Sequence, residues 1–181
     1  MPTTNTTRIE FSRPLMTQRL MRDGRHPFEE SATDAERAEL AVLFDATEVR
    51  AFTLTGEVRP DGDGLTLDAR LRAEVVQPCV VSLRPVTTTL DEPVKRHYDP
   101  ALDPEAVDLD IEAEEEVEPL PRTLDLGLVA IEAAALALPA YPRHPDAGDG
   151  DRIADDGAQD AEREKPFAAL AALKEKLADK G

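Results

Sequence analysis

One apolar run, residues 122–144, constrains the fold of this chain more than any other stretch of its sequence. Its apolar side chains recur at helical spacing, and Glu132 is the one charged residue between Leu126 and Leu138. A helix that is apolar on nearly all sides is buried. The apolar part of the run, from Leu126 to Leu138, is shorter and richer in alanine than a bilayer span, which needs about 20 apolar residues. We therefore predict a buried core helix that ends at Pro139, on which the rest of the domain packs, and no membrane partner.

Alternation of apolar and polar residues predicts an antiparallel sheet. Residues 52–58 and 65–75 alternate on either side of a turn at residues 60–64, which indicates a hairpin with one buried face and one wet face, Thr66 to Glu74. Residues 80–90 are a third strand candidate, broken at proline 85 and extended by residues 93–98. Consecutive strands with short links predict a meander, either open or curled into a partial barrel.

Shorter signals lie at both ends of the chain. Residues 8–11 alternate as a short edge strand would, and extended or turning chain is expected after them. Thr33 and Glu36 form a capping-box pattern before a short helix that ends near Phe44, with Leu40 and Leu43 on its buried face. Near the other end, Lys165-Pro166-Phe167 begins an amphipathic helix, behind a stretch rich in glycine and aspartate.

The predicted fold is α+β, with an antiparallel meander packed on one buried apolar helix, a short N-terminal helix and a tethered C-terminal helix. The expected organisation is a disordered tail at residues 1–7, a single α+β domain at 8–144, a flexible acidic linker at 145–163 and a C-terminal amphipathic helix at 164–181.

The negative charge is concentrated in one third of the chain. The net charge is −17, and residues 101–160 contain 17 acidic and 3 basic side chains. Such a surface repels phosphate backbones and attracts basic proteins, unless it serves only solubility. Residues 103–118 hold nine carboxylates and no base. The candidate partner-binding residues are Asp108, Asp110, Glu112, Glu114, Glu115, Glu116 and Glu118.

Direct RNA binding is a second hypothesis, because a few basic residues could form a local patch despite the net charge. Aromatic residues make up only 4% of the chain, and no basic stretch has aromatic residues between its charges, so a platform for stacked bases is poorly supported. The candidate RNA contacts are Arg70, Arg72, Arg84, Lys95 and Arg96.

A metal or catalytic role is the third hypothesis, resting on Cys79, His97 and His144. A structural zinc ion needs four ligands, and no pair of these residues has ligand spacing. The sequence also lacks a phosphate loop, a glycine-rich dinucleotide turn and a nucleophile elbow. We therefore expect a buried structural Cys79, no cofactor and no enzymatic activity. One cysteine and the lack of an N-terminal apolar run favour a cytoplasmic protein.

Two acidic residues in the apolar run have structural explanations. Asp125 is placed to cap the start of the helix. Glu132, alone on an apolar helix, must reach solvent, pair with a base such as Arg122 or Arg143, or be functional, and we expect one of the first two outcomes. His144 follows two prolines and is expected to pack in a loop.

Two stretches of the chain, in their order and spacing, resemble the YceD family of large ribosomal RNA subunit accumulation proteins. They are residues 76–86, VQPCVVSLRPV, and residues 125–144, DLGLVAIEAAALALPAYPRH, and residues 165–170 resemble the family's tail. The motif residues in this chain are Cys79, Leu83, Pro85, Asp125, Glu132, Pro139, Pro142 and His144.

The resemblance implies a non-enzymatic role in accumulation of large-subunit ribosomal RNA and hence in ribosome assembly. Together with the charge, it points to a basic ribosomal protein or a pre-ribosomal large-subunit particle as the partner, with rRNA contact as the alternative. Many relatives have a Cys-x-x-Cys at the strand corner. Here the second position is Ser82, which places any role of a cysteine pair in doubt for this chain.

Overall fold

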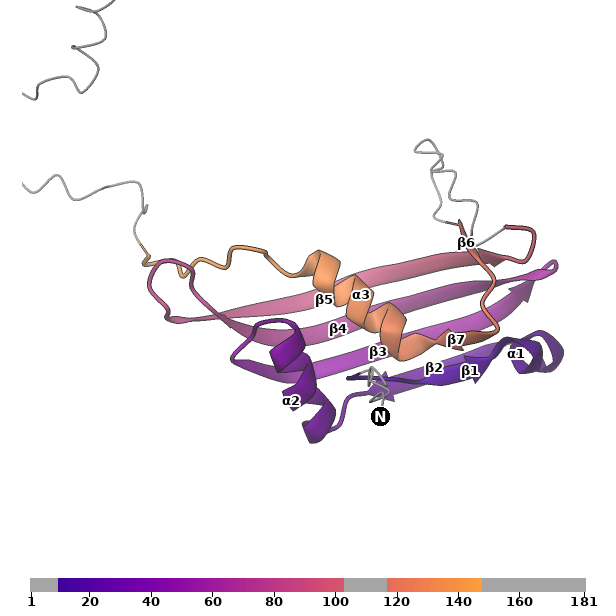
Figure 1. Ribbon diagram of the computed structural model, residues 1–181, viewed down its shortest axis with the longest axis horizontal. Helices are drawn as coiled ribbons and strands as arrows, with labels where there is room; N and C mark the ends of the chain where they lie inside the picture. Colours follow the sequence, from indigo (N-terminus) through magenta and orange to yellow (C-terminus); the bar gives the residue numbers. More distant parts are fainter. Residues whose placement is uncertain (1–9, 103–116, 148–181) are drawn as a thin grey trace, which may run out of the picture. The chain divides into compact units, whose positions relative to one another are not determined.

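An open β-sheet is the framework of the computed structural model, which describes residues 10–102 and 117–147 (Figure 1). In these residues the sheet has five strands in the order β2-β3-β4-β5-β6, and a separate ribbon pairs β1 with β7. The strands are β1 Pro14–Met16, β2 His26–Ser31, β3 Glu48–Asp61, β4 Gly64–Pro78, β5 Pro85–Asp99, β6 Val117–Pro119 and β7 Thr123–Asp125, and the helices are α1 Thr17–Asp23, α2 Asp34–Leu43 and α3 Leu126–Ala137.

The predicted α+β class and antiparallel meander are confirmed. Strands β2 to β5 are antiparallel to their neighbours, whereas β6 joins β5 in parallel. Within the described residues β2 and β6 form the two ends of the sheet, so it does not close into a barrel. The described residues belong to one compact unit, and most of the expected tail, linker and C-terminal helix lie outside them.

The core lies between one face of the sheet and α3, α2 and the β1–β7 ribbon (Figure 1). Alternate residues of β3 and β4 point into it, as the sequence predicts, and each fully buried leucine or phenylalanine contributes about 1.5–3 kcal/mol relative to an exposed one. Phe52 is at its centre, with the ring of Phe11 5.5 Å away in an edge contact and that of Phe44 6.2 Å away. No described helix packs on the opposite face of the sheet, where polar side chains of β3, β4 and β5 are exposed.

Helix α3 is buried on one side only, and this corrects the prediction of a core helix surrounded by protein. Val129, Ala130 and Ala134 face the sheet, whereas the side of α3 away from the sheet leaves Leu128 42% and Leu136 83% exposed. The prediction assumed a layer on each side of the helix, and the described structure has a layer on one side. The sheet therefore forms the core, and α3 covers it.

The N-terminal segment also differs from the prediction. Phe11 is fully buried in a bend, not in a strand, and the first strand begins at Pro14. Helix α1 and strand β2 were not predicted. Helix α1 is held by distant contacts, because the Thr17 hydroxyl donates to the Pro121 carbonyl at 2.5 Å and the Thr17 N–H to the Arg122 carbonyl at 3.2 Å.

Helix α2 begins as predicted. The Thr33 hydroxyl accepts from the Glu36 N–H at 3.3 Å, and the Glu36 carboxylate accepts from the Thr33 N–H at 2.8 Å, which completes a capping box. Leu40 is fully buried, whereas Leu43 is 45% exposed, contrary to the prediction. Thr66, predicted on the wet face, is buried, and its hydroxyl donates to Asp61 at 3.1 Å.

The strand predicted from residue 80 begins instead at Pro85 and continues to Asp99. Proline is tolerated at the first residue of a strand, and at Pro93 the far side of β5 has no described neighbour, since β6 pairs only from His97 onward. Residues 79–84 form the turn between β4 and β5. None of the described helices is long and apolar enough to cross a membrane.

Candidate functional site

The turn between β4 and β5 closes around the thiol of Cys79. The Ser82 N–H donates to the Cys79 Sγ at 3.4 Å, and the Leu83 N–H donates to the Cys79 carbonyl at 2.9 Å. The Cys79 N–H donates to the Arg84 carbonyl at 2.8 Å, which holds the two ends of the turn together. Leu83 adopts a φ of +57°, a conformation that is uncommon for a residue with a side chain.

The two stretches that resemble the YceD family meet at this turn. The His144 N–H donates to the Cys79 Sγ at 3.3 Å, and the Val80 N–H donates to the Pro142 carbonyl at 3.0 Å. The chain that leaves α3 is therefore joined to the β4–β5 turn by two backbone donors. We call residues 79–84 and 142–146 together the thiol knuckle.

Hydrogen bonding within the thiol knuckle lowers the pKa of Cys79 to about 6. The backbone N–H of His144 is the largest cause, followed by the Ser82 side chain, and burial opposes both. The thiolate is therefore favoured at neutral pH. Cys79 is fully buried, as the sequence predicts, so its sulfur acts as a hydrogen-bond acceptor that holds two segments together.

The structure does not bring the three residues of the metal hypothesis together. His97 lies opposite Thr66, at the far end of the β4–β5 ladder from the Pro78–Pro85 pair that precedes the turn. His144 approaches Cys79 through its backbone, and its ring Nδ1 accepts from the Asp146 N–H at 3.2 Å. Among the described residues no group of three potential ligands could hold a metal ion.

Of the candidate partner-binding residues, only Glu118 is among the described residues, on β6. Asp108, Asp110, Glu112, Glu114, Glu115 and Glu116 lie outside them. Burial raises the pKa of Glu118, and Arg96, whose Nε lies 3.2 Å from its carboxylate, lowers it in part. Glu132 is exposed on α3 and adds to the rise in the pKa of Glu118. Glu132 thus reaches solvent, one of the two outcomes expected for it.

The candidate RNA contacts do not form one patch. Arg70 and Arg72 share the open face of the sheet, where both pair with Asp91, at 2.5 and 3.4 Å. Lys95 points to the same face as Asp91, whereas Arg96 points to the opposite one and is buried. The fifth residue, Arg84, is in the turn and pairs with Asp146 at 3.2 Å.

Asp125 is the cap that the sequence predicts, and it does more than cap. Its carboxylate accepts from the N–H groups of Gly127 at 2.9 Å and Leu128 at 3.3 Å. It also accepts from the Arg13 N–H at 2.7 Å and the Ser12 hydroxyl at 2.6 Å. The motif aspartate thus joins the start of α3 to the N-terminal segment.

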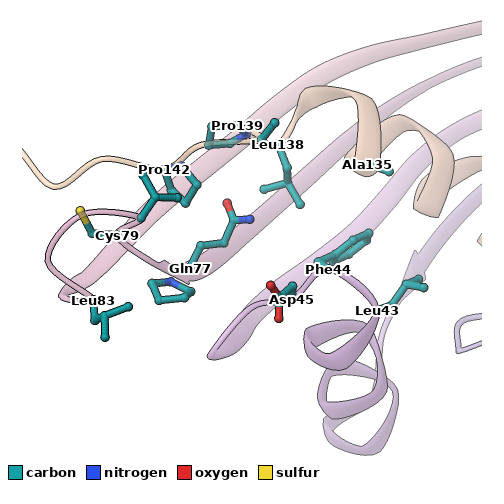
Figure 2. Close-up of a pocket in the computed structure, with 13 residues that line it drawn as sticks. Leu43, Phe44, Asp45, Gln77, Cys79, Leu83, Ala135, Leu138, Pro139 and Pro142 are labelled. Atoms are coloured by element: carbon teal, nitrogen blue, oxygen red, sulfur yellow. The ribbon is translucent and has the colours of Figure 1, made fainter. Parts of the chain in front are cut away.

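An apolar groove of about 440 Å³ borders the thiol knuckle (Figure 2). Three segments line it: the end of α2 with the residues after it, the end of β4 with the following turn, and the end of α3 with the chain after it. Four of the motif residues line this groove, namely Cys79, Leu83, Pro139 and Pro142. Sequence reasoning missed the groove, because residues 80–83 read as a strand. The signal that could have revealed it is the apolar content of a turn, since Val80, Val81 and Leu83 are 49%, 47% and 79% exposed.

Gln77 gives the groove one buried polar group. Figure 2 shows its amide directed into the space bordered by Leu138, Pro139 and Pro142. The Gln77 Oε1 atom is buried and has no hydrogen-bond partner among the described residues. An unpaired buried acceptor is costly, so its position in a groove suggests that a donor from outside the described residues completes it.

Comparison with known proteins settles the family. Residues 67–174 match the model of the family described as "Large ribosomal RNA subunit accumulation protein YceD". The chain belongs to the YceD family. The match includes most of β4, all of β5, the thiol knuckle and α3, and thus both stretches on which the resemblance rests. No curated protein and no solved structure matches the chain.

Proposed function

We propose that this protein is a non-enzymatic factor in large-subunit biogenesis, which supports rRNA accumulation by binding a basic ribosomal protein or a pre-ribosomal particle. The family description names the accumulation of an RNA and no reaction, which supports a binding role. The single observation behind the mechanism is the concentration of 17 acidic and 3 basic side chains in residues 101–160. The proposed place of action is the cytoplasm, in keeping with a single cysteine.

Electrostatics favours a protein over RNA as the first contact. A strongly acidic surface raises the local concentration of cationic partners and repels phosphates, and both effects weaken as salt screens them. A basic ribosomal protein exposes many lysines and arginines before it meets rRNA. An acidic factor can shield those charges and speed the encounter.

The described residues that flank the acidic segment, residues 103–118, are anchored close together. The Leu102 N–H donates to the Asp99 carbonyl at 3.4 Å, and the Leu120 N–H donates to the same carbonyl at 3.1 Å. Leu102 and Leu120 are therefore both anchored near the end of β5. Glu118 continues the acidic sequence onto the sheet itself.

The test measures binding of the full-length protein to purified large-subunit ribosomal proteins, identified first by pulldown at low salt with and without nuclease. We expect the affinity to fall steeply with added salt. The triple variant Glu114→Gln, Glu115→Gln, Glu116→Gln should bind roughly tenfold more weakly, taking about 0.5 kcal/mol for each charge removed. Unchanged affinity in this variant would rule out the acidic-segment mechanism.

A matched control removes the same charge elsewhere. Asp63, Asp68 and Glu92 are exposed acidic residues on the hairpin turn and the open sheet, outside the acidic segment. The variant Asp63→Asn, Asp68→Asn, Glu92→Gln should bind as the unmodified protein does. Equal weakening in both triple variants would mean that net charge, and not the acidic segment, determines binding. Binding that nuclease treatment removes would instead favour RNA as the partner.

A further inference from the structure

The apolar groove differs from an ordinary exposed surface in its composition. Val80 and Leu83 of the turn are 49% and 79% exposed, and Pro139 and Pro142 of the chain after α3 line the same groove. Leu83 is held in the left-handed region, where glycine would be cheaper, by the N–H bond to the Cys79 carbonyl. Contiguous exposed apolar side chains in a soluble domain typically mark a surface that binds something.

Two polar groups of the groove define the chemistry of its occupant. The Gln77 Oε1 atom is an acceptor without a partner among the described residues, and Gln77 is only 8% exposed. Asp45 is the one acidic residue among the described residues that line the groove, and it is exposed just after α2. Both groups accept hydrogen bonds. Lysine and arginine side chains donate hydrogen bonds and accept none, so they complement this pair.

We propose that the apolar groove docks an amphipathic segment of a basic partner protein. The segment's apolar side chains pack against Val80, Leu83 and Pro139, one of its donors bonds to the Gln77 Oε1 atom, and a lysine or arginine pairs with Asp45. This inference rests on the proposed function, since it gives the basic partner a second, apolar contact. It excludes nucleic acid as the occupant, because apolar walls and a carboxylate offer a phosphate backbone nothing to bind.

The probe is a designed 18-residue peptide with leucine on one helical face and lysine on the other, and its counterpart has glutamate in place of lysine. Binding to the full-length protein is followed by fluorescence anisotropy and by the NMR signals of the Gln77 side-chain amide. We expect the lysine peptide to bind and to shift the Gln77 signals, and the glutamate peptide to do neither.

Three substitutions test the three contacts. Leu83→Ser and Gln77→Met should each lower the affinity for the lysine peptide at least fivefold, and Asp45→Asn should lower it two- to threefold. Asparagine tolerates the φ of +49° at Asp45, so this change removes charge without straining the backbone. Gln77→Met should leave the thermal midpoint unchanged or raise it, because it removes a buried unpaired acceptor. The control is Val42→Ser, at a position 82% exposed on α2 and outside the groove, which should bind normally.

Failure of this inference can be told apart from failure of the proposed function. If Leu83→Ser and Gln77→Met bind normally while the triple variant at residues 114–116 does not, the groove is rejected and the acidic segment remains. The opposite result supports the groove and rejects the acidic segment. A photo-crosslinking residue at position 83 that links to residues 148–181 or to a second copy would overturn the inference, and so would equal binding of the glutamate peptide.

Discussion

Replacing Asp125 by alanine should destabilise the protein by about 3 kcal/mol, although the residue is only part-buried. Loss of a helix N-cap costs about 1 kcal/mol, and here the cap bonds reach Gly127 and Leu128. The bonds from the Arg13 N–H and the Ser12 hydroxyl each contribute about 1 kcal/mol more, because the acceptor is a carboxylate.

The matched substitution, Asp125→Asn, should cost less than about 1.5 kcal/mol. The three backbone donors all bond to Oδ1, which asparagine keeps, whereas the Ser12 hydroxyl bonds to Oδ2. An amide nitrogen at the Oδ2 position can donate to the Ser12 oxygen, so that contact reverses and survives. The main loss is the negative charge at the N-terminus of α3, which is worth about 0.3–1 kcal/mol.

Urea unfolding followed by far-ultraviolet circular dichroism measures both variants. For a domain of this size, about 3 kcal/mol corresponds to a fall of about 6–12 °C in the thermal midpoint. Asp34→Ala serves as the control, because the Asp34 side chain is 98% exposed in its pair with Arg37. If the alanine and asparagine variants of Asp125 were equally destabilised, the hydrogen-bond explanation would be refuted. A loss below 1 kcal/mol in Asp125→Ala would refute it as well.

Three further results are expected. Gly127→Ala should lower the free energy of unfolding by about 2 kcal/mol, measured by the same urea titration, because the added Cβ would lie 2.2 Å from the Phe11 carbonyl oxygen. The absorbance of the Cys79 thiolate at 240 nm should titrate near pH 6, and this signal should vanish in Cys79→Ser. Folding lowers the pKa of this thiol. The stability that the thiolate contributes is therefore fully present above the ordinary thiol pKa and is lost as the pH falls through 6. The hydrogen bond from Arg13 is the main cause that lowers the pKa of Glu36 to about 2, so the free energy of unfolding should fall between pH 4.5 and 2. Acid unfolding should show a smaller fall in Glu36→Gln than in the unmodified protein.

The parts of the fold predicted from sequence are those fixed by local chemistry. Alternation along β3 and β4 identified the hairpin because its two faces meet different surroundings, the core and solvent. The capping box of Thr33 and the cap at Asp125 were predictable because each N-cap bonds to N–H groups two or three residues away in sequence. Pro139 follows the observed end of α3 closely for a similar local reason.

The parts that were missed depend on contacts between distant residues. Helix α1 has seven residues and no side-chain cap, and Thr17 bonds to residues more than a hundred positions away. The apolar residues after Cys79 resemble a strand, yet bonds to its sulfur and to the Pro142 carbonyl fold them into a turn. Exposure of Leu136 could not be predicted either, because it depends on how many layers cover α3.

Only part of the candidate site was predictable for the same reason. Both motif stretches were recognised, and the burial of Cys79 was expected, but the bond from the His144 N–H to the Cys79 sulfur requires two segments 65 positions apart. The groove needs a third segment, the end of α2, which no motif includes. The buried amide of Gln77 becomes informative only once these three walls are in place.

The two anchors of α3 explain how an alanine-rich helix keeps its place. Ala130 and Ala134 present small side chains to the sheet, and small side chains interdigitate less with a neighbouring surface than large ones do. At one end the Asp125 carboxylate accepts a hydrogen bond from the N-terminal segment, and beyond the other end the Cys79 sulfur accepts one from the backbone N–H of His144. Hydrogen bonds at both ends thus fix the position of the helix along the sheet. Side chains on its exposed side can therefore be replaced without shifting the helix.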